Sequence, residues 1–122
     1  MTAEDETAYH LRHAGEWLAR LGDGTEESHR RAQAAIDLMW PYTGEMFEAP
    51  EALVAAGIVP DPGPLRAEWQ ATVASGLANA TLRRPEDGWM QSGGRHGRHS
   101  EHLGYILAEL QFLQRAYPGA QW

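Results

Sequence analysis

The chain has 122 residues, no cysteine and a formal net charge of −7 at pH 7. We expect one domain, residues 1–122, without disulfides or a cysteine nucleophile, and the acidic balance disfavours nucleic acid and anionic membrane as partners. No apolar run approaches the ~20 residues that a membrane helix needs, and the acidic N-terminus is unlike a signal peptide, so a cytoplasmic protein is expected.

Helical periodicity runs along the whole chain and predicts an all-α fold. Residues 3–21 predict a first helix, and Gly22 is a natural end for it. Thr25 can cap a second helix, which continues beyond a kink at Pro41, where proline removes a backbone donor. We expect these two helices to form a long helical hairpin over residues 1–48.

The rest of the chain predicts a linker and two further helices. Residues 49–64 are rich in proline and form the linker, with one short helical turn. The two helices lie within residues 65–117, and a Gly- and Arg-rich loop at residues 83–98 joins them. The last helix is expected to run unbroken over residues 100–117, and no segment predicts a strand.

Four residues of the hairpin are candidate metal ligands. Glu26 and His29 have the Glu-x-x-His spacing that di-metal helical bundles use, and Glu6 and His10 could add a carboxylate and an imidazole. In an antiparallel hairpin, however, Glu26 lies at the loop and Glu6 at the far end, roughly 20 Å away along the axis. That separation disfavours a shared metal pair, and Glu26 also suits a helix N-terminus.

In such a hairpin, the part of the second helix that lies opposite Glu6 contains Asp37 and Trp40. An indole cannot coordinate a metal, because its nitrogen only donates hydrogen bonds. This arrangement resembles a metal site whose histidine has been replaced, in which a buried carboxylate would need His10, His13 or an arginine as its partner. Alternatively, Glu6 is an exposed acid in the first turn of its helix. Neither interpretation yields a working redox centre.

Two further features lie toward the C-terminal end. His96, His99 and His102 are spaced so that two imidazoles could meet at a metal, but their Gly-rich surroundings favour a solvated or interface role. Trp89 and Met90 lie beside glycines and arginines, which is typical of a contact patch for another chain.

Seven runs of the sequence carry a resemblance to a known family, at residues 9–14, 20–31, 40–45, 80–82, 87–94, 102–104 and 111–122. They resemble the C-terminal half of the PaaC-type structural subunit of phenylacetyl-CoA epoxidase, the multicomponent oxygenase of aerobic phenylacetate breakdown. The resemblance implies a ferritin-like helical bundle and a non-catalytic role, with no catalytic residue and no cofactor in this chain. It also implies a ferritin-like catalytic partner subunit that holds a di-iron centre, and a reductase that supplies electrons.

Members of that family are about twice as long, so two bundle helices are missing here. Uncovered apolar surface is unfavourable by roughly 25 cal/mol per Å². We therefore expect a homo-oligomer or binding to a second helical chain. The residues expected at such an interface are Trp17, Leu18, Ile36, Met39, Trp40, Trp89 and Met90.

Two alternatives remain open. In the first, two copies of the hairpin supply two Glu-x-x-His motifs and two further glutamates, the full ligand set of an iron or manganese pair. The chain would then be a self-associating di-metal protein or oxygenase with its site formed across a homodimer. In the second, it is a small helical interaction protein outside aromatic catabolism.

Overall fold

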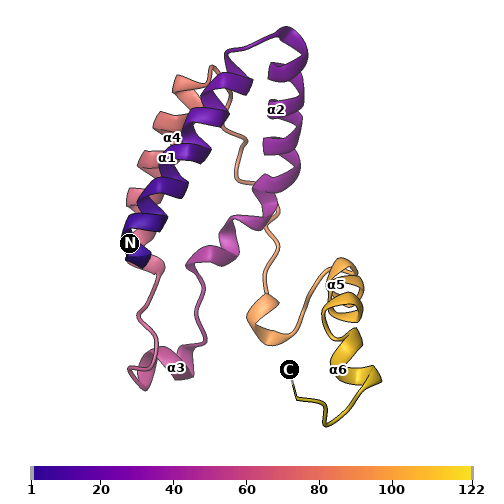
Figure 1. Ribbon diagram of the computed structural model, residues 1–122. Helices are drawn as coiled ribbons and strands as arrows, with labels where there is room; N and C mark the ends of the chain where they lie inside the picture. The colour runs from indigo at the N-terminus through magenta and orange to yellow at the C-terminus, as the bar shows by residue number, and fades with distance from the viewer. Residues whose placement is uncertain (1, 122) are drawn as a thin grey trace. The chain divides into compact units, whose positions relative to one another are not determined.

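The structure is a computed structural model that describes residues 2–121, and all regular elements in that range are helical (Figure 1). The all-α prediction is confirmed, and it agrees with a ferritin-like helical fold. None of the helices in this range is both long and apolar enough to cross a bilayer. The α-helices are α1 (Ala3–Gly22), α2 (Glu26–Met39), α3 (Glu51–Ala55), α4 (Arg66–Asn79), α5 (His102–Leu110) and α6 (Phe112–Ala116). The 3₁₀ turns are η1 (Trp40–Tyr42), η2 (Gly44–Phe47), η3 (Gly63–Leu65) and η4 (Gly94–His96).

The chain divides into two compact units, Met1–Gln91 and Ser92–Trp122. The length of the chain predicts one domain, whereas the boundary between these units falls inside the predicted loop at residues 83–98. The first unit contains α1 to α4, and the second contains η4, α5 and α6. Each unit is therefore described separately.

The first two helices begin at capping boxes. The Thr2 hydroxyl accepts the Asp5 backbone N–H at 3.3 Å, while the Asp5 carboxylate accepts the Thr2 backbone N–H at 2.9 Å. The bond from the Thr2 backbone N–H, and a further one that the Thr2 hydroxyl donates to the same carboxylate at 2.9 Å, lower the pKa of Asp5. At α2, Thr25 and Ser28 exchange the same two bonds, at 3.2 and 2.9 Å. The predicted cap at Thr25 is confirmed, because its hydroxyl satisfies a backbone donor that the helix leaves unpaired.

The prediction of a kinked helix continuing past Pro41 is wrong. α2 ends at Met39, and the chain continues as two 3₁₀ turns, η1 and η2. Pro41 lies in the first turn of η1, where its missing N–H costs no helical hydrogen bond. The Trp40 carbonyl instead accepts the backbone N–H and the hydroxyl of Thr43, at 3.0 and 2.8 Å.

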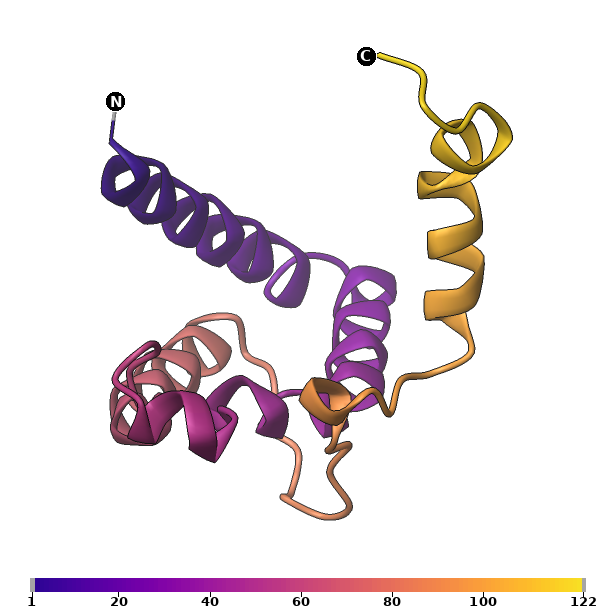
Figure 2. The same ribbon diagram turned by 90° about the horizontal axis from the view of Figure 1, so that it is seen from below.

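α1 and α2 do not form an antiparallel pair along their whole length. In both views they diverge from their junction at residues 23–25, and α1 also contacts α4 (Figures 1 and 2). The far end of α1 is consequently not opposite the end of α2, as the hairpin prediction required. Glu6 therefore does not lie opposite Asp37 and Trp40, as an antiparallel hairpin would require.

Gly22 ends α1, as predicted, and it also has a role in packing. It is the last residue of the helix, and Asp23 caps it. Gly22 is buried, and a Cβ there would overlap the carbonyl oxygen of Ala80 and lie 3.0 Å from Leu82. The missing side chain thus lets α1 pass very close to the end of α4.

The core of the first unit lies where α1, α2 and α4 meet the segment after α4. Its buried residues are Trp40, Leu77, Ala80 and Leu82. Partly buried side chains pack around them: Leu18, Ala32, Ile36, Trp69, Val73 and Met90. The Trp69 ring lies 5.8 Å from that of Trp40 and 5.2 Å from that of Phe47, measured between centroids. Trp69, Val73 and Leu77, which are spaced four residues apart on α4, therefore face the core, whereas Leu65 just before the helix is exposed.

The second unit consists of short helical pieces. η4 lies between Gly93 and Gly97, whose φ values of 91° and 80° suit glycine. The unbroken last helix predicted at residues 100–117 is wrong, because Gln111 separates α5 from α6. None of the described residues in this unit is buried.

Candidate functional site

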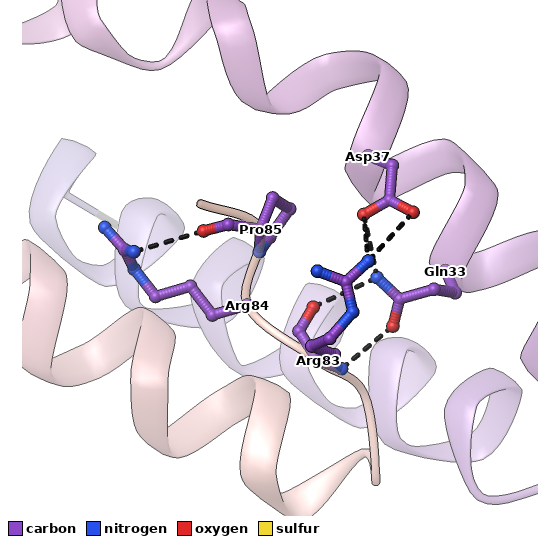
Figure 3. Close-up of polar contacts among 5 residues, drawn as sticks. All are labelled: Gln33, Asp37, Arg83, Arg84 and Pro85. Carbon is purple, nitrogen blue, oxygen red and sulfur yellow. Dashed lines mark hydrogen bonds and ion pairs between the residues drawn. The ribbon is translucent and has the colours of Figure 1, made fainter. Parts of the chain in front are cut away.

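A polar clasp joins α2 to the segment that follows α4, and we call it the Gln33–Arg83 clasp (Figure 3). The Gln33 side chain donates to the Arg83 carbonyl at 3.0 Å and accepts the Arg83 backbone N–H at 2.8 Å. It also donates to the Asp37 carboxylate at 3.0 Å. The Arg83 guanidinium donates to the same carboxylate at 3.2 Å. Asp37 thus has an arginine as its ionic partner, and not His10 or His13.

A second set of contacts surrounds Trp40. Its indole N–H donates to Asp87 at 2.9 Å, and Arg84 donates to both carboxylate oxygens of Asp87, at 2.9 and 2.7 Å. The Arg84 guanidinium also lies over the Trp40 ring, 4.8 Å from its centroid. The bonds from Arg84 first, and then from Trp40, lower the pKa of Asp87. The indole nitrogen therefore acts as a hydrogen-bond donor that holds the segment after α4.

The structure does not bring the four candidate metal ligands together. Glu6, His10 and Glu26 are exposed, and His29 lies 2.7 Å from the Gly22 carbonyl through Nδ1. His29 thus caps the C-terminal end of α1, a role for which its sequence spacing gives no signal. Within residues 2–121, no three His, Asp or Glu side chains gather as a metal site requires. These residues do not fit a metal pair held by this chain alone.

The three C-terminal histidines lie in successive pieces of the second unit. His96 lies in η4, His99 in the following segment and His102 at the start of α5, and all three are exposed. The described residues around them form no group of three that could hold a metal ion. Their solvated or interface role stays a prediction.

The predicted interface residues fall into two groups. Trp40 is only 6% exposed, so the expectation that it lies uncovered at an interface is wrong. Its burial follows from its stacking on Trp69 and its hydrogen bond to Asp87. Half-buried side chains that pack on the core are Leu18, Ile36 and Met90, and the exposed ones are Trp17, Met39 and Trp89.

Trp89 projects from a segment that is attached at both ends. On one side, Asp87 is held by Arg84 and Trp40. On the other, the Gln91 backbone N–H donates to the Pro41 carbonyl at 2.8 Å. The indole between these two points is 71% exposed. A large aromatic side chain held out by a fixed backbone is typical of an anchor residue at a protein interface.

An aromatic stripe on α1 is a feature that the sequence analysis did not identify. The ring of His13 stacks on Tyr9 at 5.7 Å and meets Trp17 edge-on at 6.3 Å. Arg20 lies over the Trp17 ring at 5.3 Å, and about half of the surface of Tyr9 and Trp17 is exposed. The i, i+4 spacing of these three rings is the signal that could have found the stripe. Aromatic and arginine side chains of this kind are enriched at protein interfaces.

Comparison with known proteins identifies the family. Residues 2–122 match the family described as phenylacetic acid catabolic protein. A curated relative from Escherichia coli (strain K12), named as a component of 1,2-phenylacetyl-CoA epoxidase, is 48% identical over 120 residues. The match covers 96% of this chain and 48% of the relative, so the chain spans about half the length of that protein. The resemblance noted in the sequence is thereby confirmed, and the chain belongs to the phenylacetic acid catabolic protein family.

Proposed function

We propose that the chain is a non-catalytic structural component of a phenylacetyl-CoA ring 1,2-epoxidase in aerobic phenylacetate catabolism. In this role it supports a ferritin-like catalytic subunit that holds the di-iron centre, and it works in the cytoplasm. The observation that carries the proposal is the 48% identity over 96% of this chain to a protein named as one component of that enzyme.

The contacts of the acidic and imidazole side chains support a structural role. Asp37 pairs with Arg83, and His29 contacts the Gly22 carbonyl, so these groups stabilise the fold. Asp87 is likewise occupied by Arg84 and Trp40. Iron chemistry would need several such groups to converge on one point, and here each serves a separate packing contact.

Two exposed surfaces suit the catalytic subunit as partner. The first is the aromatic stripe of α1, and the second is the indole of Trp89. Both combine a large apolar ring with a neighbouring arginine or a fixed backbone, which limits the side-chain entropy lost on binding. We assign the contact with the catalytic partner to these two surfaces.

The test is co-purification of a tagged form of this chain with the catalytic subunit, followed by iron analysis and an assay of phenylacetyl-CoA epoxidation with the reductase. We expect a stable complex whose iron belongs to the catalytic subunit, with higher turnover than that subunit shows alone. Failure to form a complex would refute the structural role. About two iron or manganese ions per dimer of this chain alone would favour the di-metal alternative instead.

A further inference from the structure

The backbone conformation of Thr81, just beyond the end of α4, is unusual for its side chain. Its φ is 56°, and among residues 2–121 every other positive φ belongs to a glycine. The turn closes α4 with two hydrogen bonds, from the Thr81 N–H to the Ala78 carbonyl at 3.1 Å and from the Leu82 N–H to the Leu77 carbonyl at 2.9 Å. Glycine or asparagine commonly occupies this position, since a β-branched side chain is crowded at positive φ. The conformation of Thr81 therefore depends on a contact outside α4.

That contact is a hydrogen bond to the end of α1. The Thr81 hydroxyl donates to the Gly22 carbonyl at 3.1 Å, across 59 positions of the sequence. Nδ1 of His29, in α2, lies 2.7 Å from the same carbonyl oxygen and 3.5 Å from the Thr81 hydroxyl. A carbonyl oxygen only accepts, so Nδ1 carries a proton and donates it. One carbonyl group of α1 thus holds both a residue of α2 and the residue that ends α4.

The Gly22 carbonyl reaches both donors because the backbones of α1 and α4 come very close together here. A Cβ at Gly22 would overlap the Ala80 carbonyl oxygen, and Ala80 has no exposed surface. Backbone atoms rather than flexible side chains therefore set the distance between the two helix ends. While the helices are in contact, the junction has little room to adjust.

The segment 81–91 leaves α4 in a direction that Thr81 sets. Leu82, its next residue, is 6% exposed in the core. At the far end of the segment, the Gln91 N–H donates to the Pro41 carbonyl at 2.8 Å. Rotation of Thr81 to a negative φ would turn every later residue of the segment away from its present path. The placement of the whole segment therefore depends on one backbone torsion.

We propose that Gly22, His29 and Thr81 form a conformational latch. While α1 is packed on α4, the Gly22 carbonyl holds Thr81 in a conformation that its side chain disfavours. When the end of α1 moves away, the hydroxyl loses its acceptor, Thr81 relaxes to a negative φ, and residues 82–91 leave the core as a unit that carries Trp89. Strained residues persist where surrounding contacts fix them, and they are concentrated at switch regions. The latch acts within the first unit and does not depend on the role proposed above.

Hydrogen exchange of single backbone amides tests the latch, because exchange reports the rare opening of a segment. Thr81→Val removes the hydroxyl and keeps the β-branched shape. We expect the N–H groups of Leu82, Arg83 and Gln91 to exchange at least tenfold faster than in the parent, by a common factor. An increase at Leu82 and Arg83 alone would show a local turn contact and would overturn the latch. No increase at any of the three would overturn it as well.

His29→Ala tests the link to α1, because it removes the second donor to the Gly22 carbonyl and leaves Thr81 intact. We expect the same three amides to exchange at least threefold faster. His29→Asn is the matched rescue, since the asparagine side-chain nitrogen stands where Nδ1 of His29 was, and it should exchange as the parent does. Unchanged exchange in His29→Ala would show that the segment is independent of α1 and would contradict the proposal.

Thr81→Gly separates the strain from the hydrogen bond. Glycine also lacks the hydroxyl, but it adopts a φ near 56° without strain. The same amides should therefore exchange at least threefold more slowly than in Thr81→Val. Equal or faster exchange in Thr81→Gly would show that no strain is stored at this residue, and the latch would be refuted.

Two controls should match the parent. Thr81→Ser keeps the hydroxyl, and Thr7→Val removes a hydroxyl bond of 2.9 Å to the Ala3 carbonyl within α1. Circular dichroism checks that all variants keep their helicity. If either control accelerated exchange as much as Thr81→Val, the effect would be a general loosening of the fold and the latch would be wrong.

Discussion

The side-chain amide of Gln33 pairs with both backbone groups of Arg83, in the manner of a neighbouring strand. Its oxygen accepts the Arg83 N–H at 2.8 Å, and its nitrogen donates to the Arg83 carbonyl at 3.0 Å (Figure 3). The two residues are 50 positions apart, so this pair attaches the segment after α4 to α2. It thereby helps to place the buried Leu82 and the partly buried Met90, which belong to the core.

We expect Gln33→Ala to lower the free energy of unfolding by about 1–2 kcal/mol, because three exposed hydrogen bonds are lost, two to the Arg83 backbone and one to Asp37. Urea unfolding followed by circular dichroism measures the change. Gln33→Glu is the informative comparison, since it keeps an acceptor for the Arg83 N–H but cannot donate to the carbonyl. An unchanged stability in Gln33→Ala would show that water replaces the clasp at no cost.

Asp87→Ala removes the acceptor of the Trp40 indole N–H. Trp40 is 6% exposed, so its donor is left without a partner, and we expect a loss of about 1–2 kcal/mol. Trp fluorescence during urea unfolding reports the change. Asp87→Asn is the control, because its amide oxygen can still accept the indole N–H.

The same carboxylate makes stability depend on pH. Its pKa is lowered in the folded chain by Arg84 and Trp40, so it binds fewer protons there than in the unfolded chain. The contribution is therefore fully present above the ordinary carboxyl pKa of about 3.9 and is lost as the pH falls below it. The stability difference between the parent and Asp87→Asn should shrink from pH 6 to pH 3. A constant difference across this range would contradict the assignment.

Gly22→Ala tests the close crossing of α1 over the end of α4. The added methyl would overlap the Ala80 carbonyl oxygen, and we expect a loss of about 1–3 kcal/mol. Gly15→Ala in the same helix is the matched control. Nothing lies within 4 Å of its Cβ, so the better helix propensity of alanine should raise stability by about 0.5–1 kcal/mol. Thermal unfolding of the two variants should therefore shift in opposite directions.

Trp17→Ala and Trp89→Ala test the two surfaces assigned to the catalytic subunit. We expect each to weaken the complex at least tenfold with little change in the melting temperature, because Trp17 is 47% and Trp89 71% exposed. Ile58→Ala is the control, because Ile58 is an apolar residue that is 69% exposed and belongs to neither surface. Binding is measured by titration with the purified catalytic subunit. A similar effect of all three substitutions would show that the contact is not localised at the indoles.

The helices and their beginnings could be predicted from local sequence. The Thr25 cap and the helical periodicity of the chain are recognisable, because capping and periodicity depend only on neighbouring residues. The end of α2 was missed for a reason that is not local. The stacking of Trp40 on Trp69 and its bond to Asp87 draw the chain out of the helix after Met39, and both partners are distant in sequence.

For the candidate metal residues too, local sequence supplied the spacing but not the partners. Their spacing predicted possible ligands, but an antiparallel hairpin had to be assumed in order to pair them. In the structure α1 and α2 diverge (Figure 2), and Asp37 pairs with Arg83, a residue 46 positions away. No pattern within a single helix contains that information.

By itself, the sequence determined that this protein is all-α, which family it belongs to, and where its first two helices begin. These properties follow from helical periodicity, from runs of residues shared with the family, and from capping side chains that bond to the backbone of the first helical turn. Only the tertiary structure decided that Trp40 is buried, that Gly22 serves a close helix crossing, and that the acidic side chains stabilise packing contacts. Such roles depend on which distant segments come into contact. The contribution of each side chain to stability is set by its burial and by the geometry of its partners, and both exist only after those segments have packed together.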